Sequence, residues 1–149
     1  MKIQYKYLLL IAWMVVIFLL SNEVAGTSHA RSAAIVGVLV NSLHVSLPEN
    51  VLMFLTRKAA HIVAYFVLGM LMYNVVKEYK YSIKCTILLS ILFALGYAAF
   101  DEIHQLFVSG RSGQVTDVLI DTTASSVGVS VYYFVYKIQS SRINSKDTL

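Results

Sequence analysis

Four apolar stretches divide the chain, and each approaches the length of a membrane-spanning helix. The stretches cover about residues 7–22, 59–76, 83–100 and 115–136. A helix that crosses the hydrocarbon core of a bilayer needs about 20 mostly apolar residues, and about 17 are enough when it is little tilted. The pattern therefore predicts an all-α, polytopic membrane protein with about four transmembrane helices, in which residues 1–149 form a single domain.

The fourth stretch is more polar than the other three, because it carries Asp117, Asp121 and several Ser and Thr residues. Ionisable side chains in a membrane helix almost always face the interior of a helix bundle rather than lipid. The small residues Ala124, Ser125 and Gly128 would also allow a neighbouring helix to approach closely. We therefore expect the polar side of this stretch to pack inside the bundle.

The first stretch is the shortest, and it could be a signal peptide. Lys2 and Lys6 precede it, and basic residues typically precede the apolar core of a signal peptide. A signal peptide also needs small residues at a cleavage site, and Ser28-His29-Ala30 matches such a site poorly. We therefore expect the first stretch to remain in the protein as an uncleaved helix.

The longest connection, residues 22–56, has a helical pattern of its own. Ile35, Val38, Leu39 and Leu43 recur at helical spacing. We interpret this part as an interfacial or re-entrant segment in the first outer loop. Pro48 then interrupts the chain before residues 51–55, which lead into the second stretch.

Composition supports a membrane protein and excludes most other classes. Of the 149 residues 58% are hydrophobic and 13% are charged, whereas about a quarter of a soluble protein is charged. The net charge of +4 comes from residues at the predicted membrane edges and not from a basic stripe with interleaved aromatic residues. We therefore expect membrane lipids as partners and no nucleic acid. The single cysteine, Cys85, excludes an internal disulfide.

The basic residues also predict an orientation. With both termini inside, eight basic residues fall on the inner side and four on the outer side, which satisfies the positive-inside rule. The inner eight are Lys2, Lys6, Lys77, Lys80, Lys84, Lys137, Arg142 and Lys146, and the outer four are Arg31, Arg57, Lys58 and Arg111. We expect cytoplasmic N- and C-termini, a polar and basic inner tail at residues 137–149, and a belt of tyrosines at the inner boundary.

Polar residues gather at three predicted helix ends on the outer side. In the second helix, Arg57, His61 and Tyr65 are four positions apart and so share one face, as Asp117 and Asp121 do in the fourth. A dense polar run follows the third stretch. The candidate ligand-binding residues are Arg57, Lys58, His61, Tyr65, Asp101, Glu102, His104, Gln105, Arg111, Asp117 and Asp121. Because the three ends lie at similar depth, these side chains could meet.

Three kinds of role are open to this polar cluster. The arginines and the lysine could neutralise Asp101, Glu102 and Asp117 in a structural ion-pair network. Arginine also binds phosphate well, and carboxylates and amides suit sugar hydroxyls, so the cluster could bind an anionic or sugar-bearing envelope lipid. Enough carboxylates and histidines are present for a divalent cation, but no compact motif such as HExxH occurs. We therefore expect neither a metal nor another cofactor.

Three motifs resemble those of the VanZ-like family, small bacterial membrane proteins associated with teicoplanin resistance. Residues 57–69 resemble the family's RK-x-x-H-x-x-x-Y-x-x-L-G opening, and residues 101–111 resemble its DE-x-x-Q-x-F-x-x-GR signature. Asp117 with Asp121 and Gly128 resembles the start of the family's last helix, and Phe18 through Ser21 more weakly resembles its F-x-x-S. Ala64 is a departure, because it stands where many members carry an acid.

The resemblance implies a four-helix protein of the bacterial cell (plasma) membrane, but it supplies no mechanism and no catalytic residues. Our leading hypothesis is that the outward-facing cluster binds a lipid-linked envelope component, such as a precursor, or a lipoglycopeptide, which in some family members would lower sensitivity to glycopeptides such as teicoplanin. One alternative is a membrane-embedded hydrolase or transferase that acts on an envelope lipid with His61 or His104 as general base. Another is a small transporter in which Asp117 and Asp121 bind and release protons.

Overall fold

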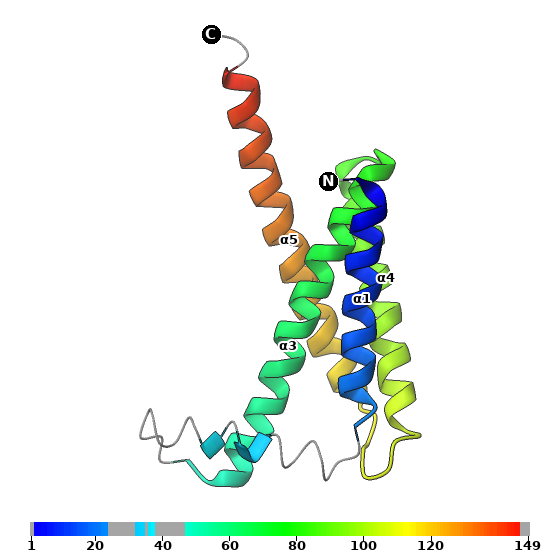
Figure 1. Cartoon of the computed structure of the whole chain (residues 1–149), viewed down its shortest axis with the longest axis vertical. Coiled ribbons are helices and arrows are strands. Elements are labelled where there is room, and N and C mark those ends of the chain that lie inside the picture. The colour runs from blue at the N-terminus through cyan, green and yellow to red at the C-terminus, as the bar shows by residue number, and fades with distance from the viewer. Residues whose placement is uncertain (1, 24–31, 35, 38–46, 147–149) are drawn as a thin grey trace.

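The computed structural model describes residues 2–23, 32–34, 36–37 and 47–146, and these residues form helices without a strand. Four long helices make up the structure: α1 (Ile3–Ser21), α3 (Glu49–Val76), α4 (Ile83–Gln105) and α5 (Val115–Lys146) (Figure 1). The 3₁₀ turn η1 (Lys77–Tyr79) joins α3 to α4, and Lys80 completes the turn with a φ of 57°. The fold class is therefore all-α, as predicted.

All four helices are long and apolar enough to cross a membrane. The qualifying segments are Ile3–Ser21, Asn50–Tyr79, Ile83–Gln105 and Val115–Ser141. Because the number of spans is even, the N- and C-termini lie at the same end of the bundle (Figure 1). We call this the termini end. The opposite end, where residues 106–114 connect α4 to α5, is the loop end.

The helices extend beyond the apolar stretches that predicted them. α3 begins at Glu49, directly after Pro48 in an extended conformation, and continues through the apolar residues 51–55 and the polar residues 56–58 into the predicted stretch. α4 continues to Gln105, so the polar run that starts at Asp101 forms its last turns. α5 continues through the polar tail to Lys146, since no glycine or proline follows Gly128.

Little of the predicted interfacial segment falls within the described residues. Residues 32–34 and 36–37 are helical, and Ser32 and Val36 are buried. Ile35, Val38, Leu39 and Leu43 lie outside the described residues. The interfacial or re-entrant form of this segment therefore stays a prediction.

α3 occupies the centre of the bundle and packs against α1, α4 and α5. It meets α5 most closely, where each helix places a glycine against the backbone of the other. A Cβ atom on Gly69 would lie 2.1 Å from the Ser125 carbonyl oxygen, and one on Gly128 would lie 2.0 Å from that of Phe66. The Ser125 hydroxyl donates a hydrogen bond to the Tyr65 carbonyl oxygen at 2.9 Å. The small residues of α5 thus permit the close contact that the sequence predicted.

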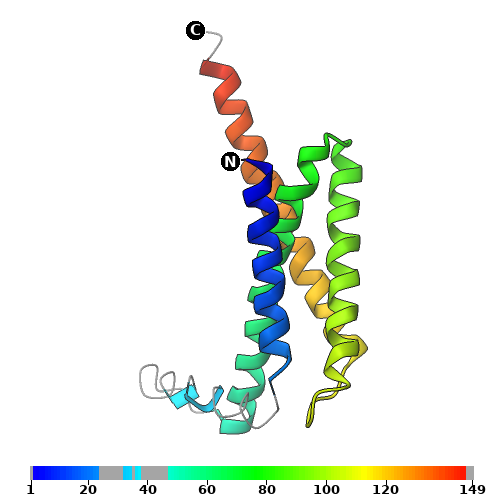
Figure 2. The same ribbon diagram turned by 45° about the vertical axis from the view of Figure 1, so that its right-hand side comes forward.

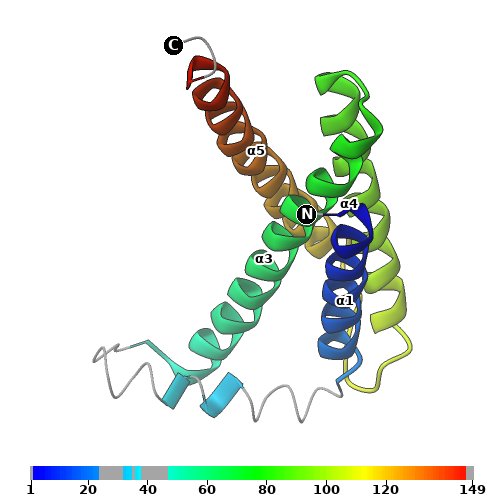
Figure 3. The same ribbon diagram turned by 45° about the horizontal axis from the view of Figure 1, so that its top comes forward.

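Beyond this crossing, α5 leaves the bundle. Figures 1 and 3 show its C-terminal half leaning away from α1 and α4 toward the termini end, and Figure 2 shows it leaning away from α4. Side chains along this half are mostly exposed, including Phe134 and Ile138. The buried part of α5 is its first half, which carries Asp121 and Ser125. The polar face of α5 is therefore inside the bundle, as expected.

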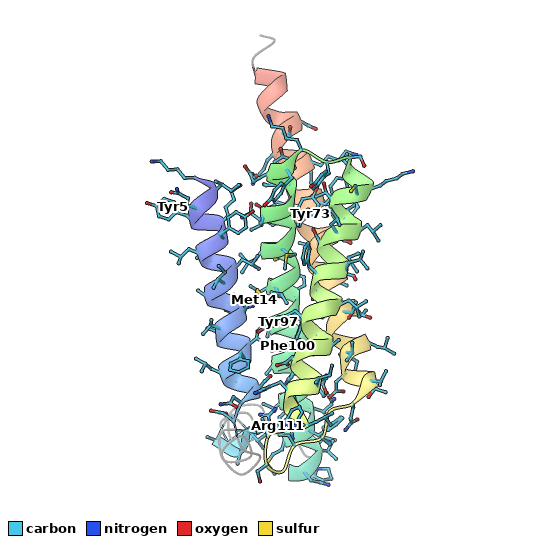
Figure 4. The ribbon with its side chains drawn as sticks, turned by 90° about the vertical axis from the view of Figure 1, so that its right-hand side faces the viewer. Tyr5, Met14, Tyr73, Tyr97, Phe100 and Arg111 are labelled. Carbon is cyan, nitrogen blue, oxygen red and sulfur yellow. The ribbon has the colours of Figure 1, made fainter. Side chains whose placement is uncertain are left out.

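Tyrosines gather at the termini end. The Tyr73 ring centroid lies 5.7 Å from that of Tyr132, and Tyr79 stacks on Tyr81. Lys77 lies over Tyr132 and donates a hydrogen bond to its hydroxyl at 3.2 Å. Figure 4 shows Tyr73 near this end of the bundle and Arg111 near the other. This distribution matches the aromatic belt that marks a membrane boundary.

We predict that Gly69→Ala destabilises the protein, because the new methyl group would overlap the α5 backbone, which cannot move aside as a side chain can. Overpacking of this kind costs about 1–3 kcal/mol of the free energy of unfolding. An unfolding titration in mixed micelles measures the loss. Gly96→Ala is the matched control, since no atom lies within 4 Å of its Cβ position. Equal stability of the two variants would contradict the close crossing.

Candidate functional site

The carboxylate of Asp101 joins three helices at the loop end. Its Oδ2 atom accepts hydrogen bonds from the Ser21 hydroxyl of α1 at 2.8 Å and from the Tyr65 hydroxyl of α3 at 3.2 Å. Gln105, one turn further along α4, donates a third at 3.4 Å. Asp101 is 1% exposed, and its Oδ1 atom is buried without a partner among the described residues. Asp101 is therefore the central acceptor of the cluster.

Glu102 fixes the connection between α4 and α5. It accepts a hydrogen bond from the Gln105 amide at 3.1 Å and another from the backbone N–H of Gln114 at 2.8 Å. Gly113 lies so close that a Cβ atom there would be 2.4 Å from the Glu102 carbonyl oxygen. Gln105 thus bridges Asp101 and Glu102, and the connection is held against the end of α4.

The partly buried His61 and the buried Asp121 form a second pair, between α3 and α5. The His61 Nδ1 atom lies 3.3 Å from the Asp121 Oδ2 atom, and Asp121 is 1% exposed. The His61 ring also stacks on Tyr65 at a centroid distance of 6.3 Å. A carboxylate on Nδ1 fixes the orientation of an imidazole ring and leaves Nε2 to accept or donate a proton.

The ion-pair network, one of the roles that the sequence leaves open, is only partly formed. Lys58 pairs with Asp117, and both side chains are partly exposed. Among the described residues, the more deeply buried Asp101, Glu102 and Asp121 have no lysine or arginine partner. They are held instead by hydroxyl, amide and imidazole groups. Neutralisation by lysine and arginine therefore does not explain most of the cluster.

Arg111 connects the α4–α5 turn to the end of α1. Its Nε atom donates to the Glu23 carbonyl oxygen at 2.9 Å, and an Nη atom donates to that of Leu20 at 3.1 Å. Burial lowers the pKa of the Arg111 guanidinium, and the nearby positive charge of Arg57 acts in the same direction. An anion between the two guanidinium groups would relieve their repulsion.

Arg57 and Arg111 both line a pocket of about 100 Å³ between α1 and α3, which we call the arginine pocket. Its apolar wall consists of Ile17, Leu20, Ala60 and Ala64, and its polar wall includes Ser21, Glu23, Ser32, Thr56, His61 and Tyr65. Two of these polar groups, the hydroxyls of Ser21 and Tyr65, also donate to Asp101. The pocket is therefore built on the same hydrogen bonds that organise the cluster.

A second pocket, of about 140 Å³, lies between α3 and the start of α5, and we call it the polar pocket. It is lined by Phe54, Arg57, Lys58, His61, Gln105, Ser112, Gln114 and Asp117. Arg57 and His61 line both pockets and so separate them. Seven of the eleven residues predicted from the sequence line one of the two pockets. Three more, Asp101, Glu102 and Asp121, bind to lining residues through their side chains.

His104 is the exception. It packs against Phe18 of α1, with ring centroids 4.5 Å apart, and its Nδ1 atom is buried without a partner among the described residues. It lines neither pocket. No group of three or more His, Cys, Asp or Glu residues in the described part of the chain is arranged to hold a metal ion.

Three kinds of contact that complete the site could not be assigned from the sequence. Ser21 entered only as part of a weak motif, although a hydroxyl at the end of an apolar helix can serve as a hydrogen-bond donor inside a bundle. The Gln114 backbone N–H and the carbonyl oxygens that Arg111 binds left no signal, because every residue has such groups.

Comparison with models of protein families gives a match. A family model described as VanZ/LLP1 matches residues 6–136, which is most of the chain. The comparison with curated proteins gives no match, and neither does the comparison with solved structures. The resemblance noted from the three motifs is therefore confirmed at the level of the family.

We predict that Asp101→Ala lowers the free energy of unfolding by about 3 kcal/mol, because it leaves the buried hydroxyl groups of Ser21 and Tyr65 without an acceptor and leaves Gln105 with Glu102 alone. Asp101→Asn keeps one acceptor oxygen and should cost less. Asp117→Ala is the control from the same cluster, and its partly exposed pair with Lys58 should contribute below about 1 kcal/mol. The measurement is an unfolding titration in mixed micelles. A loss for Asp101→Ala no larger than the control would refute the central role of Asp101.

Proposed function

The chain belongs to the VanZ/LLP1 family, and we propose that it is a membrane protein of the bacterial cell envelope that binds an anionic envelope lipid at the loop end. The observation that carries this proposal is the pair of guanidinium groups, Arg57 and Arg111, in one pocket with an apolar wall. An amphiphile with a negatively charged head has this same combination of charge and hydrocarbon.

Arg57 is the residue best suited to bind the anionic head. Among the described residues, its guanidinium makes no hydrogen bond or ion pair, so its donors are available to a ligand. Guanidinium groups bind phosphate through paired, charge-assisted hydrogen bonds. Arg111 is held by two carbonyl oxygens and adds positive charge from a fixed position.

The buried acids have a different role in this proposal. Asp101 and Glu102 accept hydrogen bonds that fix Ser21, Tyr65, Gln105 and the α4–α5 connection. They thereby set the shape of both pockets rather than contacting the anion. Asp117, at the edge of the polar pocket, is exposed enough to accept hydrogen bonds from ligand hydroxyl groups.

The association of this family with teicoplanin resistance fits such a site in two ways. Teicoplanin is a lipoglycopeptide, so its acyl chain offers the hydrocarbon that the arginine pocket would accept. Alternatively, the protein withholds a lipid-linked envelope precursor from the antibiotic. Either event would lower sensitivity to the drug, and both require the loop end to face outward.

We propose that the protein lies in the plasma membrane with cytoplasmic termini, as the distribution of basic residues predicts. On a Cys85→Ser background, Ser112→Cys at the loop end should react with a membrane-impermeant maleimide in intact spheroplasts. Ser82→Cys, an exposed position near the termini end, should react only after lysis. The reverse labelling pattern would place the cluster on the cytoplasmic side and remove the link to an extracellular antibiotic.

We predict that Arg57→Gln weakens binding of dodecyl phosphate about 10- to 100-fold, since one charge-assisted hydrogen bond contributes about 1.5–3 kcal/mol. Titration of the protein in nanodiscs measures the affinity. Lys84→Gln removes the same charge from an exposed position at the start of α4, and its affinity should match that of wild type.

Native mass spectrometry of the same two variants identifies lipids that copurify. The proposed function requires that wild type and Lys84→Gln retain an anionic lipid that Arg57→Gln has lost. Equal affinity and equal lipid content in all three proteins would show that the arginine pocket does not hold an anion.

A further inference from the structure

The two pockets at the loop end meet at Arg57 and His61. These residues are four positions apart on α3, on one face of the helix, and each lines both pockets. The arginine pocket lies on the α1 side of them, and the polar pocket lies on the side of α5. A single ligand centred at Arg57 would therefore extend into both.

The two pockets differ in chemistry. From Arg57 toward α1, the arginine pocket offers an apolar wall that includes Ile17, Leu20 and Ala64, beside the polar wall described above. Toward α5, the polar pocket presents side chains that donate and accept hydrogen bonds. These are Lys58, Gln105, Ser112, Gln114 and Asp117. A ligand that fills both pockets must be apolar at one end and rich in hydroxyl groups at the other.

We infer that the site takes one molecule in which a phosphate joins a hydrocarbon chain to a sugar. The phosphate lies at Arg57, the start of the chain lies in the arginine pocket, and the sugar lies in the polar pocket. This inference rests on the proposed function, because it assigns the ligand class of the same site. It adds a second subsite and an orientation.

The position of the phosphate follows from the charges. Arg57, Arg111 and Lys58 surround the junction of the pockets. Lys58 is paired with Asp117, and Arg111 is held by two carbonyl oxygens, whereas the Arg57 guanidinium makes no hydrogen bond or ion pair among the described residues and is the cation open to a phosphate. A phosphodiester carries one negative charge and has free oxygens on both sides for a guanidinium group.

Simpler ligands leave part of this surface unused. A phospholipid without a sugar leaves the polar pocket to water, and a neutral glycolipid leaves Arg57 without an anion. Hydrogen bonds that a ligand fails to form with such groups cost affinity. The expected order of affinity is therefore a sugar-linked lipid phosphate first, then the lipid phosphate, and then the neutral glycolipid.

Three amphiphiles with the same chain test this order: glucose 1-(dodecyl phosphate), dodecyl phosphate and dodecyl glucoside. Trp13 is the sole tryptophan, and its indole N–H donates to the carbonyl oxygen of Ala64, a residue of the arginine pocket, at 2.9 Å. Its fluorescence therefore reports occupancy of that pocket in nanodiscs. We expect the sugar-linked phosphate to bind about fivefold or more tighter than dodecyl phosphate.

Two matched variants separate the subsites. Ser112→Phe fills the polar pocket and should reduce the affinity ratio of the sugar-linked phosphate to dodecyl phosphate to about one. Ser109→Phe places the same ring on an exposed position of the same connection that lines neither pocket, so the ratio should stay at its wild-type value.

The possible results distinguish the two proposals. A wild-type ratio of one, or a ratio that Ser112→Phe leaves unchanged, overturns the sugar subsite while the lipid-binding function stands. If neither phosphate binds more tightly than dodecyl glucoside, the proposed function itself fails. A wild-type preference that Ser112→Phe abolishes and Ser109→Phe retains supports both.

Discussion

The hydrogen bonds to Asp101 are the constraint on which the loop end of this structure depends. A carboxylate buried in a helix bundle is costly unless its oxygens have partners, because neither lipid nor a dry protein interior can solvate it. Here the partners, Ser21, Tyr65 and Gln105, come from α1, α3 and α4. The three hydrogen bonds to the Oδ2 atom of one acid therefore fix the relative positions of three helices.

Polar contacts also explain how α1 is held. α1 buries the smallest share of its residues among the four helices, and in lipid no hydrophobic force favours helix association. Polar contacts instead run along its whole length. From one end to the other they link Lys6 to Glu78, Trp13 to the Ala64 carbonyl, Met14 to Tyr97 and Ser21 to Asp101. Figure 4 shows Met14 and Tyr97 at mid-height in the bundle.

The remaining helices are joined by close packing. Gly69 and Gly128 bring the backbones of α3 and α5 together, and a side chain at either position would collide with the opposite helix. The arginine pocket lies at the boundary between the closely packed pair α3 and α5 and the helix α1, which is held by polar contacts. Its shape therefore depends on the same hydrogen bonds that hold Ser21 and Tyr65, which links the buried acid to the proposed ligand site.

The sequence by itself determined the four helices, because the length and apolarity of each stretch leave few other structures possible in a bilayer. It also indicated that Arg57, His61, Asp101 and Asp121 could meet, since they lie near three helix ends at similar depth. Only the tertiary structure decided how they pair. Partners far apart in the chain depend on the rotation of each helix about its axis, which packing sets. That rotation turned His104 toward Phe18 and away from both pockets.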